Sequence, residues 1–214
     1  MQEKKPLPYS TRVLSKSENY PTFEELAEVI RADHPDFQLT VEEGNEEEWE
    51  TLLLSSLDEV EVALLERNPV EDGSVGQDEI ADLLEDITGC KPESAVEWLE
   101  EYLDEVQTVY GFQHLQGAET VDGLSALHAL RSVLMERGEA ILQADGEGFT
   151  NEGGFHILWQ FSEMAAGPWN MGVLQDGVWH QFAMDLGDPG HREAFLSGEV
   201  PHDVSSTIAT GTDE

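Results

Sequence analysis

Apolar residues recur every three or four positions in several stretches of this chain, the spacing that places them on one face of a helix. The first stretch begins at Thr22, which forms a capping box with Glu25, and continues through Leu26, Val29 and Ile30. The same spacing predicts further helices. They are expected at residues 49–57, 80–87, 95–103, 124–134 and 191–196.

Other stretches alternate apolar and polar residues or are rich in β-branched and aromatic side chains, which is typical of strands. Strands are expected at residues 37–41, 60–64, 106–115, 140–144, 155–161, 169–174 and 178–186. Asp176 and Gly177 between the last two predict a tight hairpin turn, because both turn positions tolerate positive φ. The elements do not alternate as in a doubly wound fold, and the C-terminal third is rich in hairpins. We therefore predict an α+β fold with a mixed or antiparallel sheet and helices packed on it.

The chain has 214 residues, enough for one large domain or two small ones. Residues 1–20 are rich in proline and serine and are expected to form a flexible N-terminal segment, with a second flexible tail at residues 203–214. Residues 21–202 between them are expected to form the α+β domain. Two lobes, 21–117 and 118–202, are an equal alternative to a single domain.

The charge of the chain is extreme. Lys and Arg number 10 against 46 Asp and Glu, a formal net charge of -36. The imbalance is greatest in residues 41–105, where 23 acidic residues face only two bases, Arg67 and Lys91. Such a molecule repels nucleic acid and anionic membranes, so neither is expected as a partner.

Three interpretations of this acidity stay open. The first is solubility, to which net charge contributes directly. The second is adaptation to high salt, which the scarcity of lysine favours and the excess of Glu (31) over Asp (15) does not. The third is a docking surface for a basic protein, since complementary charge raises the encounter rate and selects the partner. In that interpretation Glu46, Glu47 and Glu48 are candidate partner-binding residues.

The single cysteine, Cys90, excludes an intramolecular disulfide and favours a reducing compartment. The first residues lack the apolar core of a signal peptide, and no run approaches the ~18 apolar residues that span a bilayer. We therefore expect a cytoplasmic protein.

Recognisable catalytic motifs are absent. The sequence has no P-loop, no nucleophile elbow, no dinucleotide-binding glycine pattern and no paired metal-binding cysteines, so no cofactor and no metal are expected. One enzymatic alternative uses Asp145 and Glu147, from the glycine-rich loop 145–154, with His156 and His180 from two predicted strands. If those strands were neighbours, a carboxylate–histidine pair could do hydrolytic acid–base work, with or without the help of a metal ion. A hairpin loop and two partly buried histidines are the structural alternative.

Aromatic residues are concentrated between positions 155 and 182. Packing in a small sheet core explains them, because aromatic rings supply much of the bulk of such cores. Trp169 and Trp179 are nevertheless candidate contact residues, because aromatic side chains are favoured anchors in protein interfaces. An exposed aromatic face would also allow a homodimer.

The preferred hypothesis is a non-enzymatic, strongly acidic cytosolic interaction protein of the inhibitor, immunity or adaptor type that binds a basic protein. The alternative is a hydrolytic enzyme with the carboxylate/histidine site described above.

Overall fold

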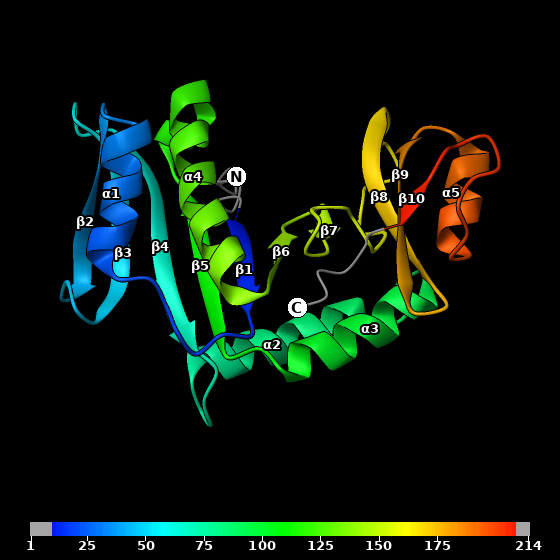
Figure 1. Cartoon of the computed structure of the whole chain (residues 1–214), viewed down its shortest axis with the longest axis horizontal. Coiled ribbons are helices and arrows are strands. Elements are labelled where there is room, and N and C mark those ends of the chain that lie inside the picture. The colour runs from blue at the N-terminus through cyan, green and yellow to red at the C-terminus, as the bar shows by residue number, and fades with distance from the viewer. Residues whose placement is uncertain (1–9, 209–214) are drawn as a thin grey trace, which may run out of the picture. The chain divides into compact units, whose positions relative to one another are not determined.

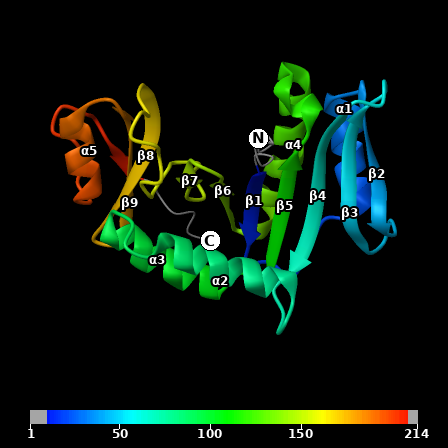
Figure 2. The same cartoon turned by 180° about the vertical axis from the view of Figure 1, so that it is seen from behind.

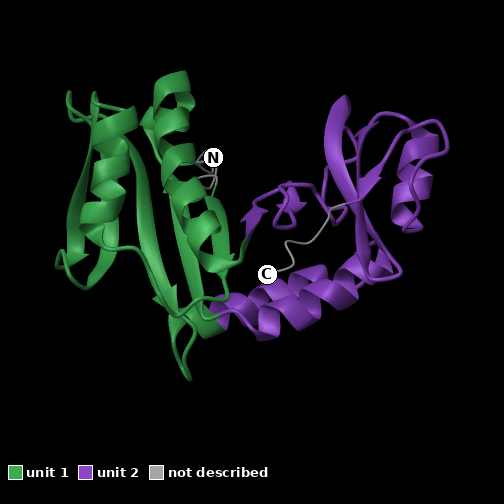
Figure 3. Cartoon of the chain, viewed as in Figure 1, with its two compact units in different colours: residues 1–77, 107–140 green, residues 78–106, 141–214 purple. Residues whose placement is uncertain are grey.

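The computed structural model describes residues 10–208, and the chain divides into two compact units that each draw on separate stretches of sequence (Figure 3). Unit 1 contains the described residues up to 77 together with 107–140, and unit 2 contains 78–106 together with the described residues from 141. The division therefore does not follow the chain. A cut between residues 117 and 118 would fall inside unit 1, because residues 107–140 add a strand and a helix to the N-terminal strands.

Unit 1 is built on an antiparallel sheet in which five strands follow the order β2-β3-β4-β5-β1 (Figure 1). The strands are β1 (Ser10–Ser15), β2 (Phe37–Gly44), β3 (Trp49–Ser56), β4 (Glu61–Pro69) and β5 (Thr108–His114). With the helices below, this confirms the α+β prediction.

Two helices, α1 (Phe23–Asp33) and α4 (Val121–Gly138), cover one face of this sheet, and the short 3-10 helix η1 (Gln116–Glu119) precedes α4 (Figure 1). The predicted capping box is confirmed at the start of α1: the Glu25 backbone N–H donates to the Thr22 hydroxyl, and the Thr22 N–H donates to the Glu25 carboxylate. Apolar side chains from both layers form the core of the unit. Its fully buried members include Val13, Leu26, Ile30, Leu52, Leu65, Phe112, Leu127 and Leu130.

Unit 2 combines helices with a smaller antiparallel sheet of order β10-β9-β8. Its elements are α2 (Val75–Ile87, whose first turn belongs to unit 1), α3 (Glu93–Asp104), β6 (Ala140–Ala144), β7 (Gly148–Phe149), β8 (Pro168–Gln175), β9 (Val178–Asp185), α5 (Pro189–Leu196) and β10 (Thr207–Ile208). The predicted hairpin between β8 and β9 is confirmed, with φ of 51° at Asp176 and 77° at Gly177. Met171, Phe182 and Phe195 lie in the core of this sheet.

The predicted helix at residues 49–57 is wrong, because this segment is strand β3. The helix is predicted because Trp49, Leu52, Leu53 and Leu57 have the spacing of one helix face. In the strand, Leu52 and Leu54 point to the helix-covered face while Leu53 points to the other. Pairing with β2 on one side and β4 on the other decides the conformation.

One other predicted element also differs from the structure. The predicted strand 155–161 is irregular apart from isolated bridges at His156, and the Trp159 N–H donates to the carbonyl of Lys91. Part of the predicted flexible segment 1–20 is strand β1, which is held by pairing with β5 and by burial of Val13 and Leu14. Strand β10 likewise lies within the predicted tail 203–214. Residues 1–9 and 209–214 lie outside the described part of the chain.

Within residues 10–208, every helix is too short or too polar to cross a lipid bilayer.

Candidate functional site

The acidic side chains of residues 41–105 lie on the surface. Of the 23, all but Glu79 are exposed. The two bases of the segment are engaged: Lys91 forms an ion pair with Glu93, and Arg67 is held by aromatic rings as described below. This ion pair lowers the pKa of Glu93. The segment therefore presents a large excess of negative charge to solvent within each unit.

Glu46, Glu47 and Glu48 form the exposed turn between β2 and β3. The side-chain oxygen of Asn45 accepts hydrogen bonds from the backbone N–H groups of Glu47 (2.9 Å) and Glu48 (3.0 Å). Gly44 has φ of 87°, and a Cβ there would stand 2.3 Å from the carbonyl oxygen of Glu48. The turn is therefore held in one conformation by its own backbone contacts, with the three carboxylates directed to solvent.

The guanidinium of Arg67 is held among aromatic rings at one end of the unit 1 sheet. Its central carbon lies 3.9 Å from the centroid of the Tyr20 ring and 5.6 Å from that of Trp49. Its Nε donates to the carbonyl oxygen of Trp49 at 2.9 Å. Burial raises the pKa of Tyr110 to about 12, although the charge of Arg67 acts in the opposite direction. These contacts give Arg67 a structural role through cation–π attraction.

Arg67 also lines two cavities of about 340 Å³ and 380 Å³. The first is bordered by Glu43, Glu50, Thr51, Glu66 and Asn68, and by the residues that lead into α2. The second is bordered by Glu18 and Glu71 among others. Both are rimmed by carboxylates, which makes them unfavourable for anions and favourable for a cationic side chain.

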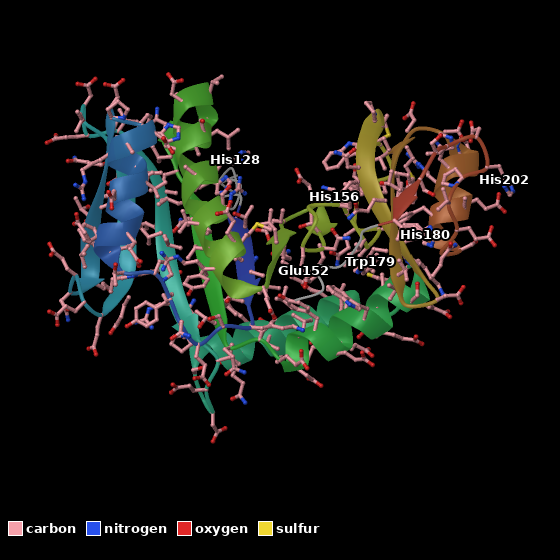
Figure 4. The ribbon with its side chains drawn as sticks, viewed as in Figure 1. His128, Glu152, His156, Trp179, His180 and His202 are labelled. Atoms are coloured by element: carbon pink, nitrogen blue, oxygen red, sulfur yellow. The ribbon has the colours of Figure 1, made fainter. Side chains whose placement is uncertain are left out.

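The two candidate tryptophans lie on opposite faces of the unit 2 sheet. Trp169 is half-buried, and its ring centroid lies 4.8 Å from the rings of both His156 and Phe161. Trp179 is also half-buried and makes an edge-to-face contact with Trp98 of α3 at 5.2 Å (Figure 4). Both rings pack against other aromatic side chains, so neither presents its whole surface to solvent.

The four residues of the enzymatic alternative all belong to unit 2, and its two histidines, His156 and His180, are labelled in Figure 4. His156 forms a parallel bridge with Met171 of β8, whereas His180 on β9 is paired with Val173 on the other side of β8. Strand β8 therefore lies between the segments that carry the two histidines. Among residues 10–208, no three His, Cys, Asp or Glu side chains are grouped so that they could hold a metal ion.

His156 has an unusual environment. Its Nδ1 is buried and has no hydrogen-bond partner among residues 10–208, while the ring forms a hydrogen bond with the backbone of Glu147. Burial lowers the pKa of His156 to about 4 and outweighs that hydrogen bond, which acts in the opposite direction. The imidazole is therefore neutral at pH 7. Asp145 and Glu147 lie in the turn between β6 and β7, where Gly146 has φ of 77° and Gly148, the first residue of β7, has φ of 90°.

The structure contains one carboxylate–histidine pair that the sequence did not indicate. His191 Nε2 lies 3.2 Å from an oxygen of Asp203, and His191 Nδ1 accepts a hydrogen bond from the Asp185 backbone N–H at 3.1 Å. Both ring nitrogens thus have hydrogen-bond partners within the chain. The twelve-residue separation of His191 and Asp203 provides no motif by which the pair could have been recognised.

Cys90 is a free thiol. Burial raises its pKa, and its Sγ contacts the carbonyl oxygen of Asp86 at 3.5 Å. A thiol with a raised pKa is a poor nucleophile.

Comparisons of the chain with models of known protein families, with curated proteins and with solved structures found no match.

Proposed function

We propose that this protein is a non-enzymatic binding protein whose acidic surface recognises a basic protein partner. The proposal rests on the uncompensated negative charge of residues 41–105, where 22 acidic side chains are exposed. The only two bases of this segment, Arg67 and Lys91, already have partners in the chain. Carboxylates that lack nearby cations repel one another, and a basic surface relieves this repulsion.

The turn that holds Glu46, Glu47 and Glu48 supports the proposal in a second way. Because Asn45 and Gly44 already fix its backbone, a partner that binds there orders little additional chain. The expected partner is a protein with a cluster of lysine or arginine side chains. The expected association is fast and sensitive to salt, because long-range attraction between opposite charges is screened by ions.

The first experiment captures binding proteins on the immobilised chain at about 50 mM and about 0.5 M salt, identifies them, and repeats the binding with purified partner. At 0.5 M salt the screening length is only a few Å. We expect the specific partner to have a high pI and to be released at high salt. A purified partner whose affinity is the same at both salt concentrations contradicts the proposal.

A matched pair of variants locates the interaction. Changing Glu46, Glu47 and Glu48 to Gln removes three charges from the turn, and changing Glu97, Glu100 and Glu101 to Gln removes three exposed charges from α3. Because the two variants carry the same net charge, a larger loss of partner affinity in the first identifies the turn as part of the contact. Equal affinities in both variants and the unaltered chain would contradict a role for these charges.

The melting temperature as a function of KCl concentration tests salt adaptation. Full stability in dilute buffer is expected for a binding surface. If the protein needed molar salt to stay folded, its acidity would be explained by adaptation to high salt and not by a binding partner.

A further inference from the structure

Within the described part of unit 1, α1 and α4 both pack on one face of the sheet and leave the other face uncovered by either helix. Helices α1 and α4 pack on the face that carries the buried side chains of Leu52, Leu65 and Phe112. Figure 2 shows the sheet from its other side, with the strands in front of these helices.

Two rows of residues cross all five strands on this second face, as the strand register requires. The first row runs from β2 to β1 through Glu43, Thr51, Glu66, Gly111 and Arg12. The second row runs in the same direction through Thr40, Leu53, Leu64, Gln113 and Ser10. We call these ten residues the open face.

Gly111 lies at the centre of the open face, in the interior of strand β5. It does not have the positive φ that would require glycine. Among residues 10–208, a Cβ at this position would meet only one neighbouring atom within 4 Å, an oxygen of Glu66 at 3.9 Å. Packing within the chain therefore does not require glycine here. Glycine weakens a strand interior, and it often marks a place where a ligand or another backbone approaches closely.

The open face also combines apolar area with exposed carboxylates, as a binding surface for a basic segment requires. Leu53 and Leu64 are directly paired and half-buried, so they offer apolar area near Gly111. We call the gap left by the absent side chain of Gly111 the notch. Glu43 and Glu66 are exposed in the adjoining row, and Thr51 between them donates to Glu43 at 3.4 Å. The same three residues border the cavity of about 340 Å³ described above.

Charge selects among possible occupants of this face. Negative charge lies over β2 and β4, at Glu43 and Glu66, while the single base, Arg12, lies on β1 at the opposite end of the row. A second copy of this chain carries the same net charge of -36 and is therefore disfavoured. A basic segment is attracted, with its positive end directed away from Arg12 and toward β2.

We propose, on the basis of the proposed function, that the open face is where the basic partner docks. A segment of the partner passes over Gly111, where the missing side chain leaves room for its backbone. A lysine or arginine of that segment reaches between Glu43 and Glu66, and its aliphatic stem covers Leu53 and Leu64. The partner is thus recognised by a basic side chain next to apolar surface, and not by positive charge alone.

The test uses two fluorescein-labelled peptides, an alternating (Lys-Leu)6 and a (Lys)12, and the full chain. We expect the unaltered chain to bind (Lys-Leu)6 more tightly than (Lys)12 in fluorescence anisotropy at about 100 mM salt. Gly111→Val fills the notch with a side chain that favours strands, so it is expected to keep or raise the melting temperature. The same variant is expected to weaken (Lys-Leu)6 binding at least tenfold.

Two control variants make the result specific. Ala183→Val places a valine at an exposed strand position of unit 2, outside the open face, and is expected to change (Lys-Leu)6 affinity less than threefold. Glu66→Gln is expected to weaken binding, whereas Glu28→Gln on α1 removes the same charge from the helix-covered side and is expected to have little effect.

Three outcomes would overturn the proposed docking site. One is undiminished (Lys-Leu)6 binding by a folded Gly111→Val, and another is equal affinity for the two peptides. The third is a dimer of the unaltered chain that Gly111→Val converts to a monomer, because the occupant would then be a second copy. A purified basic partner that still binds Gly111→Val would leave the proposed function standing and reject only the site.

Discussion

His156 is expected to make the stability of this protein depend on pH, and substitution of its side chain isolates that effect. In an unfolded chain the histidine is protonated below its ordinary pKa of 6.5, whereas in the folded protein burial lowers the pKa to about 4. Between these pH values the unfolded state binds more protons than the folded state. The free energy of unfolding therefore falls as the pH falls through this interval.

The size of the effect follows from the two pKa values. Each pH unit between them changes the free energy of unfolding by up to about 1.4 kcal/mol. The whole interval amounts to about 3 kcal/mol, a large fraction of the stability of a typical domain. The contribution is fully present above about pH 6.5 and is lost as the pH approaches 4.

His156→Phe keeps a ring against Trp169 and Phe161 and removes the titrating group. His156→Gln keeps a hydrogen-bonding group for the backbone of Glu147 and serves as a second variant. Urea unfolding followed by tryptophan fluorescence, repeated from pH 7.5 to pH 4, gives the free energy for each protein. The carboxylates titrate in all three proteins, so their contribution largely cancels in the difference between variant and unaltered chain.

We expect that difference to move by about 3 kcal/mol in favour of the variants between pH 7.5 and pH 4. A difference that stays constant within about 0.5 kcal/mol across this range would refute the reasoning. An NMR titration of the His156 ring in the unaltered protein checks the cause directly. A midpoint near 6.5 would show that the ring is not held in a desolvating environment.

Three further substitutions test the local structure through the urea midpoint. Glu59 has φ of 63°, so Glu59→Gly is expected to stabilise unit 1 by up to about 1 kcal/mol, whereas Asp58→Gly in the same turn should destabilise it. Thr22→Ala removes one half of the capping box of α1 and is expected to cost about 1 kcal/mol, with Ser in place of Ala restoring most of the loss. Gly76→Ala places a Cβ 2.5 Å from the carbonyl oxygen of Pro69 and is expected to cost about 1–3 kcal/mol; an unchanged midpoint would show that the start of α2 shifts without cost.

Features that depend on neighbours in the chain could be predicted from the amino acids alone. The capping box of α1 needs only Thr22 and Glu25, and the hairpin between β8 and β9 needs only Asp176 and Gly177. The acidity of residues 41–105, and the exposure of the turn at Glu46–Glu48, also follow from composition, because charged groups are costly to bury. These interactions join residues a few positions apart, so no knowledge of the fold is needed.

The tertiary structure decided what depends on partners distant in sequence. Strand β3 is a strand because β2 and β4 pair with it, although its apolar residues also have the spacing of a helix face. The open face exists because the register brings Glu43, Glu66 and Gly111 from three strands into one row. The pKa of His156 is lowered because the fold buries its ring, which lies beside Phe161 and Trp169. Strand pairing, register and desolvation depend on residues that are distant in the sequence, so they cannot be predicted from a pattern of neighbouring residues.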